Sequence, residues 1–83
     1  MKVLYFAWLR QRVGTGEERV EPPPSVATVK ALVEWLKERS PGHAAALADL
    51  RVVRVAINQE FAAWDAAIAP GDEVAFFPPV TGG

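Results

Sequence analysis

The chain has 83 residues, which is room for a single domain with a modest core. With 51% hydrophobic and 23% charged residues it has the composition of a globular protein, and its formal net charge of -1 gives no reason to expect nucleic acid or a membrane as a partner. The absence of cysteine excludes disulfides, a thiolate zinc site and a cysteine nucleophile, and it fits a cytoplasmic location. No apolar stretch approaches the ~20 residues that span a bilayer.

The first quarter of the chain favours two strands. Residues 3–9 are aliphatic, aromatic or β-branched, which predicts a strand covered on both faces. Residues 10–18 then form a polar turn, in which Gly14 and Gly16 can adopt positive φ. Residues 18–21 predict a short edge strand that pairs back on the first, and the three prolines at 22–24 end it.

Residues 28–39 predict the one clear helix. Four aliphatic residues at i, i+3, i+4 and i+7 form a stripe along one side, Thr28 is placed as the N-cap, and Arg39 falls in the last turn. Pro41 and Gly42 are expected to end the helix, and residues 42–50 are compatible with a further short helical turn. The stripe consists of Val29, Leu32, Val33 and Leu36.

The second half of the chain predicts three more strands. Residues 52–58 alternate, with Val53, Val55 and Ile57 on one face, which is typical of a half-buried strand. Residues 58–65 predict a turn followed by a brief strand, and residues 69–73 a tight turn. Residues 73–77 alternate again and form the last strand. No internal repeat or linker is visible.

These elements predict an α+β protein in which one main helix packs on one face of a mixed sheet. Because a single helix cannot cover both faces, the other face must be polar or must meet a partner. The helical stripe supplies the inner side of the core. The three tryptophans are expected to pack in the core or at its margins.

The domain itself shows none of the usual catalytic groupings. His43 is the only histidine, so the chain alone cannot form a histidine metal site, and we expect this side chain to be solvated or to cap a helix. The glycines at 14 and 16 lack the third glycine of a phosphate loop, so a hairpin turn is the better interpretation. The carboxylates fall mostly in turns, and no metal site is predicted.

The C-terminal end, "FFPPVTGG", differs in character from the rest. Pro78 has no N–H to donate, so strand pairing should stop after Phe77, which divides the chain into a domain at 1–77 and a flexible tail at 78–83. The two prolines form a stiff stem. Glycines at the tip fit a narrow channel, where the Gly83 carboxylate is the functional group. The alternative is an end that is frayed and glycine-rich by accident.

An exposed apolar patch is expected beside the point where the tail leaves the domain. Phe77 lies on one face of the last strand, and Phe61 and Phe6 could join it, which is typical of a protein interface. We also expect Arg10 or Arg12 to pair with acidic residues of a partner.

Three stretches together carry a family resemblance. "KVLYFAWLR" at the start, "VRVAINQE" in the middle and "GDEVAFFPPVTGG" at the end resemble the small subunits of molybdopterin synthase, which are sulfur carriers. The likeness covers nearly the whole chain, and its most specific part is the terminal block. The resemblance implies a ubiquitin-like β-grasp fold.

The resemblance also implies a function for the tail. An E1-like adenylating enzyme uses ATP and Mg²⁺ to activate Gly83, and a sulfurtransferase then supplies the sulfur of a thiocarboxylate. The tail enters the active site of the synthase large subunit, within a heterotetramer, and donates sulfur to the dithiolene of the pterin. Such a chain binds no cofactor of its own and is a cosubstrate more than an enzyme. The residues implied to thread the partner's site are Pro78, Pro79, Val80, Thr81 and Gly82.

Two other functions stay open. One keeps the carrier but changes its pathway, as in a thiamine-type carrier, a tRNA-thiolating carrier or a protein-conjugating ubiquitin relative. The other is a β-grasp interaction module whose tail has no chemistry.

Overall fold

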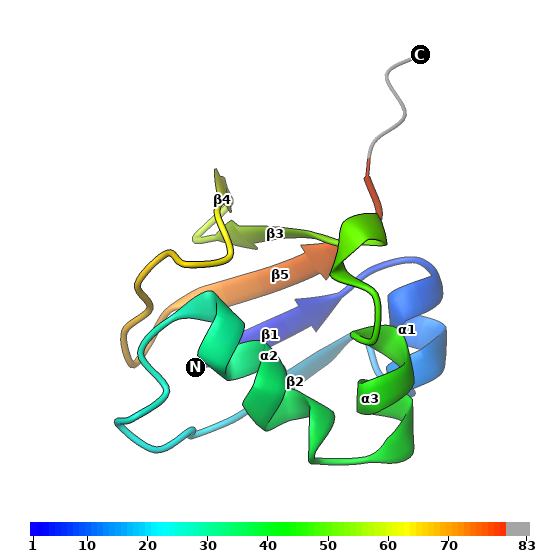
Figure 1. Ribbon diagram of the computed structural model, residues 1–83, viewed down its shortest axis with the longest axis horizontal. Coiled ribbons are helices and arrows are strands. Elements are labelled where there is room, and N and C mark those ends of the chain that lie inside the picture. Colours follow the sequence, from blue (N-terminus) through cyan, green and yellow to red (C-terminus); the bar gives the residue numbers. More distant parts are fainter. Residues whose placement is uncertain (80–83) are drawn as a thin grey trace.

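The computed structural model describes residues 1–79. They form one five-stranded sheet in the order β2-β1-β5-β3-β4, with α2 and α3 on one face and α1 beside the end of β1 (Figure 1). β1 and β5 are parallel and the other neighbours are antiparallel. The elements are β1 (Lys2–Tyr5), α1 (Trp8–Val13), β2 (Glu17–Arg19), α2 (Val29–Lys37), α3 (Pro41–Ala46), the 3₁₀ helix η1 (Leu50–Val52), β3 (Arg54–Ile57), β4 (Glu60–Ala62) and β5 (Glu73–Phe77).

The core lies between α2 and one face of the sheet. The four residues of the predicted stripe on α2 are buried, and Thr28 caps the helix by accepting a hydrogen bond from the Ala31 backbone N–H, as predicted. Alternate residues of the strands meet this stripe: Val3 and Tyr5 from β1, and Val74 and Phe76 from β5. All three tryptophans pack against the core from its margin, which confirms the prediction for them.

The predicted α+β architecture, with one main helix on a mixed sheet, is confirmed, and the strand order is that of a β-grasp fold. The tight β3–β4 turn places Asn58 and Gln59 at φ 51° and 70°, as a type I′ hairpin turn requires. Gly71 has φ 91° in the turn before β5, where the sequence predicted a tight turn.

The prediction of one strand over residues 3–9 was wrong, because the chain leaves β1 after Tyr5 and forms α1. Ala7 turns the backbone with φ 56° and ψ −132°, and the N–H groups of Leu9 and Arg10 bond to the carbonyls of Phe6 and Ala7. The Phe6 N–H still donates to the Phe76 carbonyl over 3.1 Å, but β5 ends at Phe77 and β2 pairs no further than Leu4, so the residues after Phe6 have no strand to pair with. Residues 10–13 of the predicted polar turn are therefore helical, and residues 17–18 belong to β2.

The end of the main helix also differs from the prediction. α2 stops at Lys37, and Arg39 lies beyond it. Pro41 begins α3 instead of only ending α2, because proline fits the first turn of a helix, where its missing N–H is not needed. The Ser40 hydroxyl caps α3 by accepting the backbone N–H of His43.

Candidate functional site

The tail leaves the domain from the central strand of the sheet. β5 is flanked by β1 and β3, ends at Phe77, and continues into the half-buried residues Pro78 and Pro79 (Figure 1). Pairing therefore stops where Pro78 was predicted to stop it. The remaining predicted tail residues, 80–83, lie outside the described residues, so the division at 77 and the roles given to these residues stay predictions.

Two aromatic rings lie side by side where the tail begins. Phe61 on β4 is 81% exposed, and the centroid of its ring is 5.7 Å from that of Phe77, which is half-buried. Phe6, just beyond β1, is 48% exposed. A hydrophobic ring this exposed gains from being covered by another surface. The exposure expected for the patch is present, and its role as an interface stays a prediction.

Arg10 lies on α1 and not in a loop, and its side chain is exposed. It lies over Gly16, where an added Cβ would be 3.2 Å from the Arg10 Nε. The neighbouring Arg12 places its guanidinium 4.8 Å from the ring centroid of Trp8. No acidic residue among 1–79 forms an ion pair with either arginine, so both are available to a partner.

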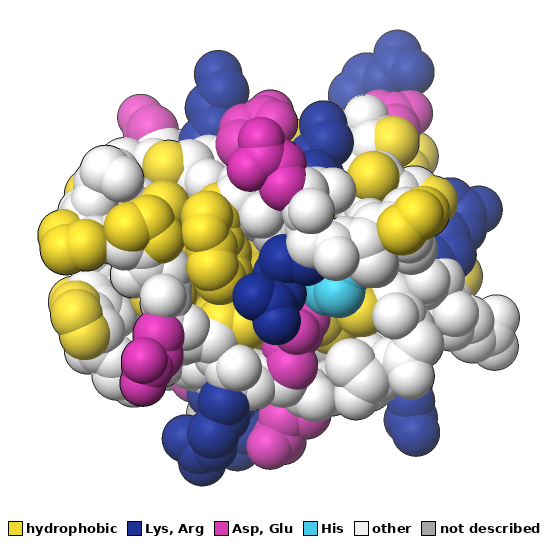
Figure 2. All heavy atoms as spheres, turned by 90° about the horizontal axis from the view of Figure 1, so that it is seen from below, with side chains coloured by type: hydrophobic (Ala, Val, Ile, Leu, Met, Phe, Trp, Pro, Cys, Tyr) yellow, Lys and Arg dark blue, Asp and Glu magenta, His cyan; other side chains and the backbone are white. Residues whose placement is uncertain are grey.

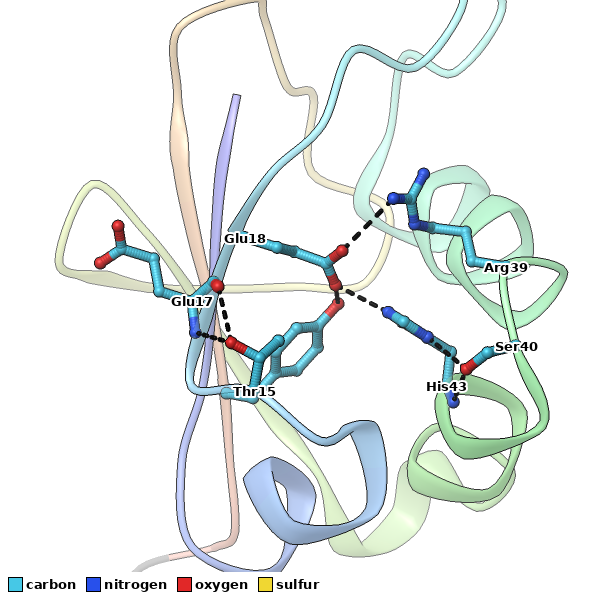
Figure 3. A network of polar contacts seen from close by, with 7 residues as sticks. Thr15, Glu17, Glu18, Arg39, Ser40 and His43 are labelled. Atoms are coloured by element: carbon cyan, nitrogen blue, oxygen red, sulfur yellow. Dashed lines mark hydrogen bonds and ion pairs between the residues drawn. The ribbon is translucent and has the colours of Figure 1, made fainter.

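A second cluster, not predicted from the sequence, joins β1, β2 and the α2–α3 connection (Figure 3). Its centre is the Glu18 carboxylate on β2. The Tyr5 hydroxyl donates to Glu18 Oε2 over 2.8 Å, and His43 Nε2 lies 2.7 Å from the same oxygen. Arg39 Nη2 is 3.5 Å from Oε1, and its guanidinium is held over the Trp35 ring. We call Tyr5, Glu18, Arg39, Ser40 and His43 the Glu18 cluster.

His43 is 8% exposed, so the expectation of a solvated side chain was wrong. In Figure 2 only a small cyan area of it reaches the surface, between dark-blue and magenta side chains. Nε2 faces the Glu18 carboxylate, so this nitrogen carries a proton and donates to it, while Nδ1 lies 2.7 Å from the Ser40 hydroxyl. The expected part in a helix cap is played by the backbone N–H of His43, which donates to the Ser40 hydroxyl at the start of α3, and not by its ring.

The electrostatics of the Glu18 cluster favour an ionised carboxylate. Burial alone raises the pKa of Glu18, but the hydrogen bonds from His43 and Tyr5 and the charges of His43 and Arg39 outweigh it and hold the pKa below its ordinary value. Burial, followed by the bond to Glu18, raises the pKa of Tyr5 far above its usual range, so the hydroxyl stays a donor.

The order Ser40–His43–Glu18 has the connectivity of a catalytic triad, but its geometry serves structure. The Ser40 oxygen that would attack a substrate accepts the backbone N–H of His43 and so caps α3. The histidine is enclosed and packs edge-on against the Tyr5 ring, with centroids 5.9 Å apart. A signal for the cluster did exist, because alternation places Glu18 on the same face of its strand as the buried Val20.

A cavity of about 560 Å³ lies at the end of the sheet where β1 and β5 start, which is the end opposite the tail. Its lining is mostly apolar and includes prolines 22–24, Met1 and Ile68. Glu21 is its one acidic side chain, so the cavity offers no pair of groups for acid–base chemistry. Within residues 1–79 no three histidine or acidic side chains come together as a metal site would need. No helix in that range is long and apolar enough to cross a membrane.

Comparison with known proteins gives one consistent result. The model of the ThiS family matches residues 3–83. The molybdopterin synthase sulfur carrier subunit of Escherichia coli (strain K12) is 43% identical over 83 residues, which cover 100% of this chain and 99% of that protein.

Two solved structures share the fold. A protein of Pyrococcus furiosus is 37% identical, with a TM-score of 0.78 and 95% of each chain covered. SAMP1 of Haloferax volcanii is 33% identical, with a TM-score of 0.75, covering 100% of this chain and 98% of that one. A family match over residues 3–83, together with these identities, is decisive: the chain belongs to the ThiS family.

Proposed function

We propose that the chain is the sulfur carrier subunit of a molybdopterin synthase. The observation that carries the proposal is its likeness, along its whole length, to the Escherichia coli protein of that name. The fold agrees with such a role, because it places the root of the tail on the central strand and provides an exposed aromatic pair beside it.

The chemistry takes place at the Gly83 carboxylate. A carboxylate oxygen attacks the α-phosphate of ATP, with Mg²⁺ held by an E1-like adenylating enzyme, and pyrophosphate leaves. Sulfur at the sulfide level, supplied through a sulfurtransferase, then attacks the Gly83 carbonyl carbon, the bond from this carbon to the phosphate oxygen breaks, and AMP leaves a thiocarboxylate behind. Adenylation supplies a leaving group that a free carboxylate lacks. The thiocarboxylate sulfur is the nucleophile that the dithiolene needs, and it requires no cysteine in the carrier.

The domain then provides the surfaces to which its partners bind. The stem formed by Pro78 and Pro79 extends residues 80–83 into the active site of the large subunit, while the patch of Phe61, Phe77 and Phe6 docks on its surface. Arg10 pairs with acidic residues nearby. In this proposal the domain comprises 1–77 and the tail 78–83, and the complex is a heterotetramer located in the cytoplasm.

Intact mass spectrometry tests the proposal. The carrier is incubated with its adenylating enzyme, ATP, Mg²⁺ and a sulfur source, and a gain of about 16 Da located on Gly83 is expected, since sulfur replaces one oxygen. The charged carrier should then convert the pterin precursor when the large subunit is added. The control is a chain with one alanine appended after Gly83. If the extended chain were charged and supported pterin synthesis as well as the natural one, the proposal would be wrong.

The likeness to SAMP1 and to the small archaeal modifier protein 1 of Haloferax volcanii favours a second candidate, a protein modifier, in which the activated Gly83 carboxyl would be joined to an amino group of an acceptor protein. It uses the same activation but a different acceptor. The two candidate functions are distinguished by what the adenylated chain goes on to form. Isopeptide-linked adducts in the presence of candidate acceptor proteins, without conversion of the pterin precursor by the large subunit, would favour the modifier.

A further inference from the structure

The face of the sheet that points away from α2, here called the open face, is organised in rows across the strands. The paired residues Leu4, Ala75, Ala56 and Phe61 form its central row, one from each of β1, β5, β3 and β4. Both alanines are nearly buried although no helix covers this face, because their small side chains lie between larger neighbours. The central row is therefore apolar along its length and ends at the exposed ring of Phe61.

The next row lies closer to the tail and contains a positive charge. Arg54 on β3 pairs in register with Phe77 on β5, so the two side chains are neighbours on the open face. Arg54, Phe61 and Phe77 together line a shallow pocket of about 340 Å³, and Val55 and Ala62 complete it. Arg54 is thus part of the same pocket as the aromatic pair.

This guanidinium is held in place but has no counter-ion within residues 1–79. Nη1 of Arg54 donates to the Val53 carbonyl over 3.0 Å and to the Arg51 carbonyl over 3.3 Å. The basic side chain that precedes it by three residues, Arg51, is by contrast paired with Asp49 at 3.0 Å. Carbonyl bonds fix the orientation of the guanidinium, and most of its five N–H donors are left for another acceptor.

A surface that covers both rings must also cover Arg54. Burying a guanidinium without an opposite charge is costly, whereas a carboxylate can accept two parallel hydrogen bonds from it. Because the carbonyl bonds already restrict its rotamers, little entropy is lost on pairing. We infer that the large subunit, in the complex that the proposed function requires, places an Asp or Glu side chain against Arg54 at the edge of the Phe61–Phe77 pocket.

Arg54 would then set which partners are accepted. An apolar surface without a carboxylate at this place leaves the guanidinium unpaired and is disfavoured, even where its shape fits the rings. Phe61 and Phe77 provide contact area, and the charge provides register and selectivity.

The experiment measures the Kd between the full-length chain and the large subunit by isothermal titration calorimetry at two salt concentrations. Arg54→Ala is expected to weaken binding at least about tenfold, and Arg54→Glu more strongly. Affinity should also depend less on salt in Arg54→Ala than in the natural chain. Arg51→Ala is the matched control, because Arg51 lies three residues before Arg54 and its guanidinium is already paired with Asp49. The Kd of this variant should change less than about twofold.

The inference is overturned if Arg54→Ala and Arg54→Glu bind as tightly as Arg51→Ala while Phe61→Ala loses affinity. In that case the natural chain still binds and transfers sulfur, so the proposed function stands without it. If the natural chain itself neither binds the large subunit nor transfers sulfur, the proposed function fails and the inference with it. Unchanged melting temperatures are expected for the three arginine variants, because both side chains are exposed.

Discussion

His43 Nε2 lies 2.7 Å from Glu18 Oε2, and this contact joins α3 to the edge strand β2 across 25 positions of the sequence. It gives the edge strand a side-chain anchor in addition to its hydrogen bonds with β1. Both groups are largely removed from solvent, so breaking one of them leaves a buried polar partner behind.

A double-mutant cycle should detect this coupling. With Glu18→Gln, His43→Leu and the double variant, we expect an interaction free energy of about 1–3 kcal/mol from urea unfolding. The pair formed by Arg51 and Asp49 is the control: its closest distance is 3.0 Å, but Arg51 is 90% exposed. It should give a much smaller interaction free energy because solvent screens it. Equal coupling energies in the two cycles would contradict the structural role given to the Glu18 cluster.

The stabilising effect of Glu18 should depend on pH with a definite sign. Because the pKa of Glu18 is lower in the folded chain than its ordinary value of 4.5, its contribution is fully present above about pH 4.5. It is lost as pH falls through the depressed folded value, where the native state also takes up the proton. The difference in unfolding free energy between the natural chain and Glu18→Gln, measured from pH 7 to pH 3, should therefore shrink in acid. A difference that grows in acid would reverse the assigned direction.

Gly42 should not tolerate a side chain. A Cβ at this position would overlap the backbone carbonyl oxygen of Arg12, where α3 approaches α1. Backbone atoms cannot rotate away as a side chain can, so Gly42→Ala is expected to lower the unfolding free energy by about 1–3 kcal/mol. Gly16→Ala is the control, since its Cβ would meet only the flexible side chain of Arg10. Thermal melts that place both variants at the same midpoint would argue against a tight α1–α3 contact.

Phe61 and Phe76 should separate binding from stability. Phe61→Ala removes a ring that is 81% exposed, so we expect an unchanged melting temperature and weaker binding to the large subunit, by about 2 kcal/mol if the ring is buried there. Phe76→Ala empties the core and should cost about 3–5 kcal/mol of unfolding free energy. Phe77→Ala and Phe6→Ala should resemble Phe61→Ala, the latter more weakly. A large loss of stability in Phe61→Ala would mean that its ring belongs to the core.

The sequence predicted those helices and strands whose buried face shows as a local pattern of apolar residues. The alternation over 73–77 and the stripe on α2 each record one face buried in the core, so both were visible without coordinates. The helix α1 was not visible, because its six residues are too few to establish a period and its start depends on where β5 ends. A strand-like composition was overridden by the absence of a neighbouring strand.

The same distinction applies to the candidate site. Phe77 alternates along β5 and is followed directly by Pro78, so a local pattern was enough to predict the end of this strand, whereas the roles of the tail and of the aromatic residues stay predictions. The Glu18 cluster brings together Tyr5, Glu18 and His43, which are far apart in the chain and meet only through packing. The neighbourhood of Arg54 and Phe77 likewise depends on strand register. Such relationships need the assembled sheet.

β1 and β5 are the first and last strands of the described chain, and they lie side by side in the middle of the sheet. β5 leaves the ribosome after the other four strands, so the middle of the sheet cannot assemble until all five strands have been synthesised. The addition of β5 to the sheet therefore completes the core and positions the start of the tail at the same time. A chain cut short before β5 lacks both, so translation itself ensures that any carrier able to fold has been synthesised through the strand that bears its tail.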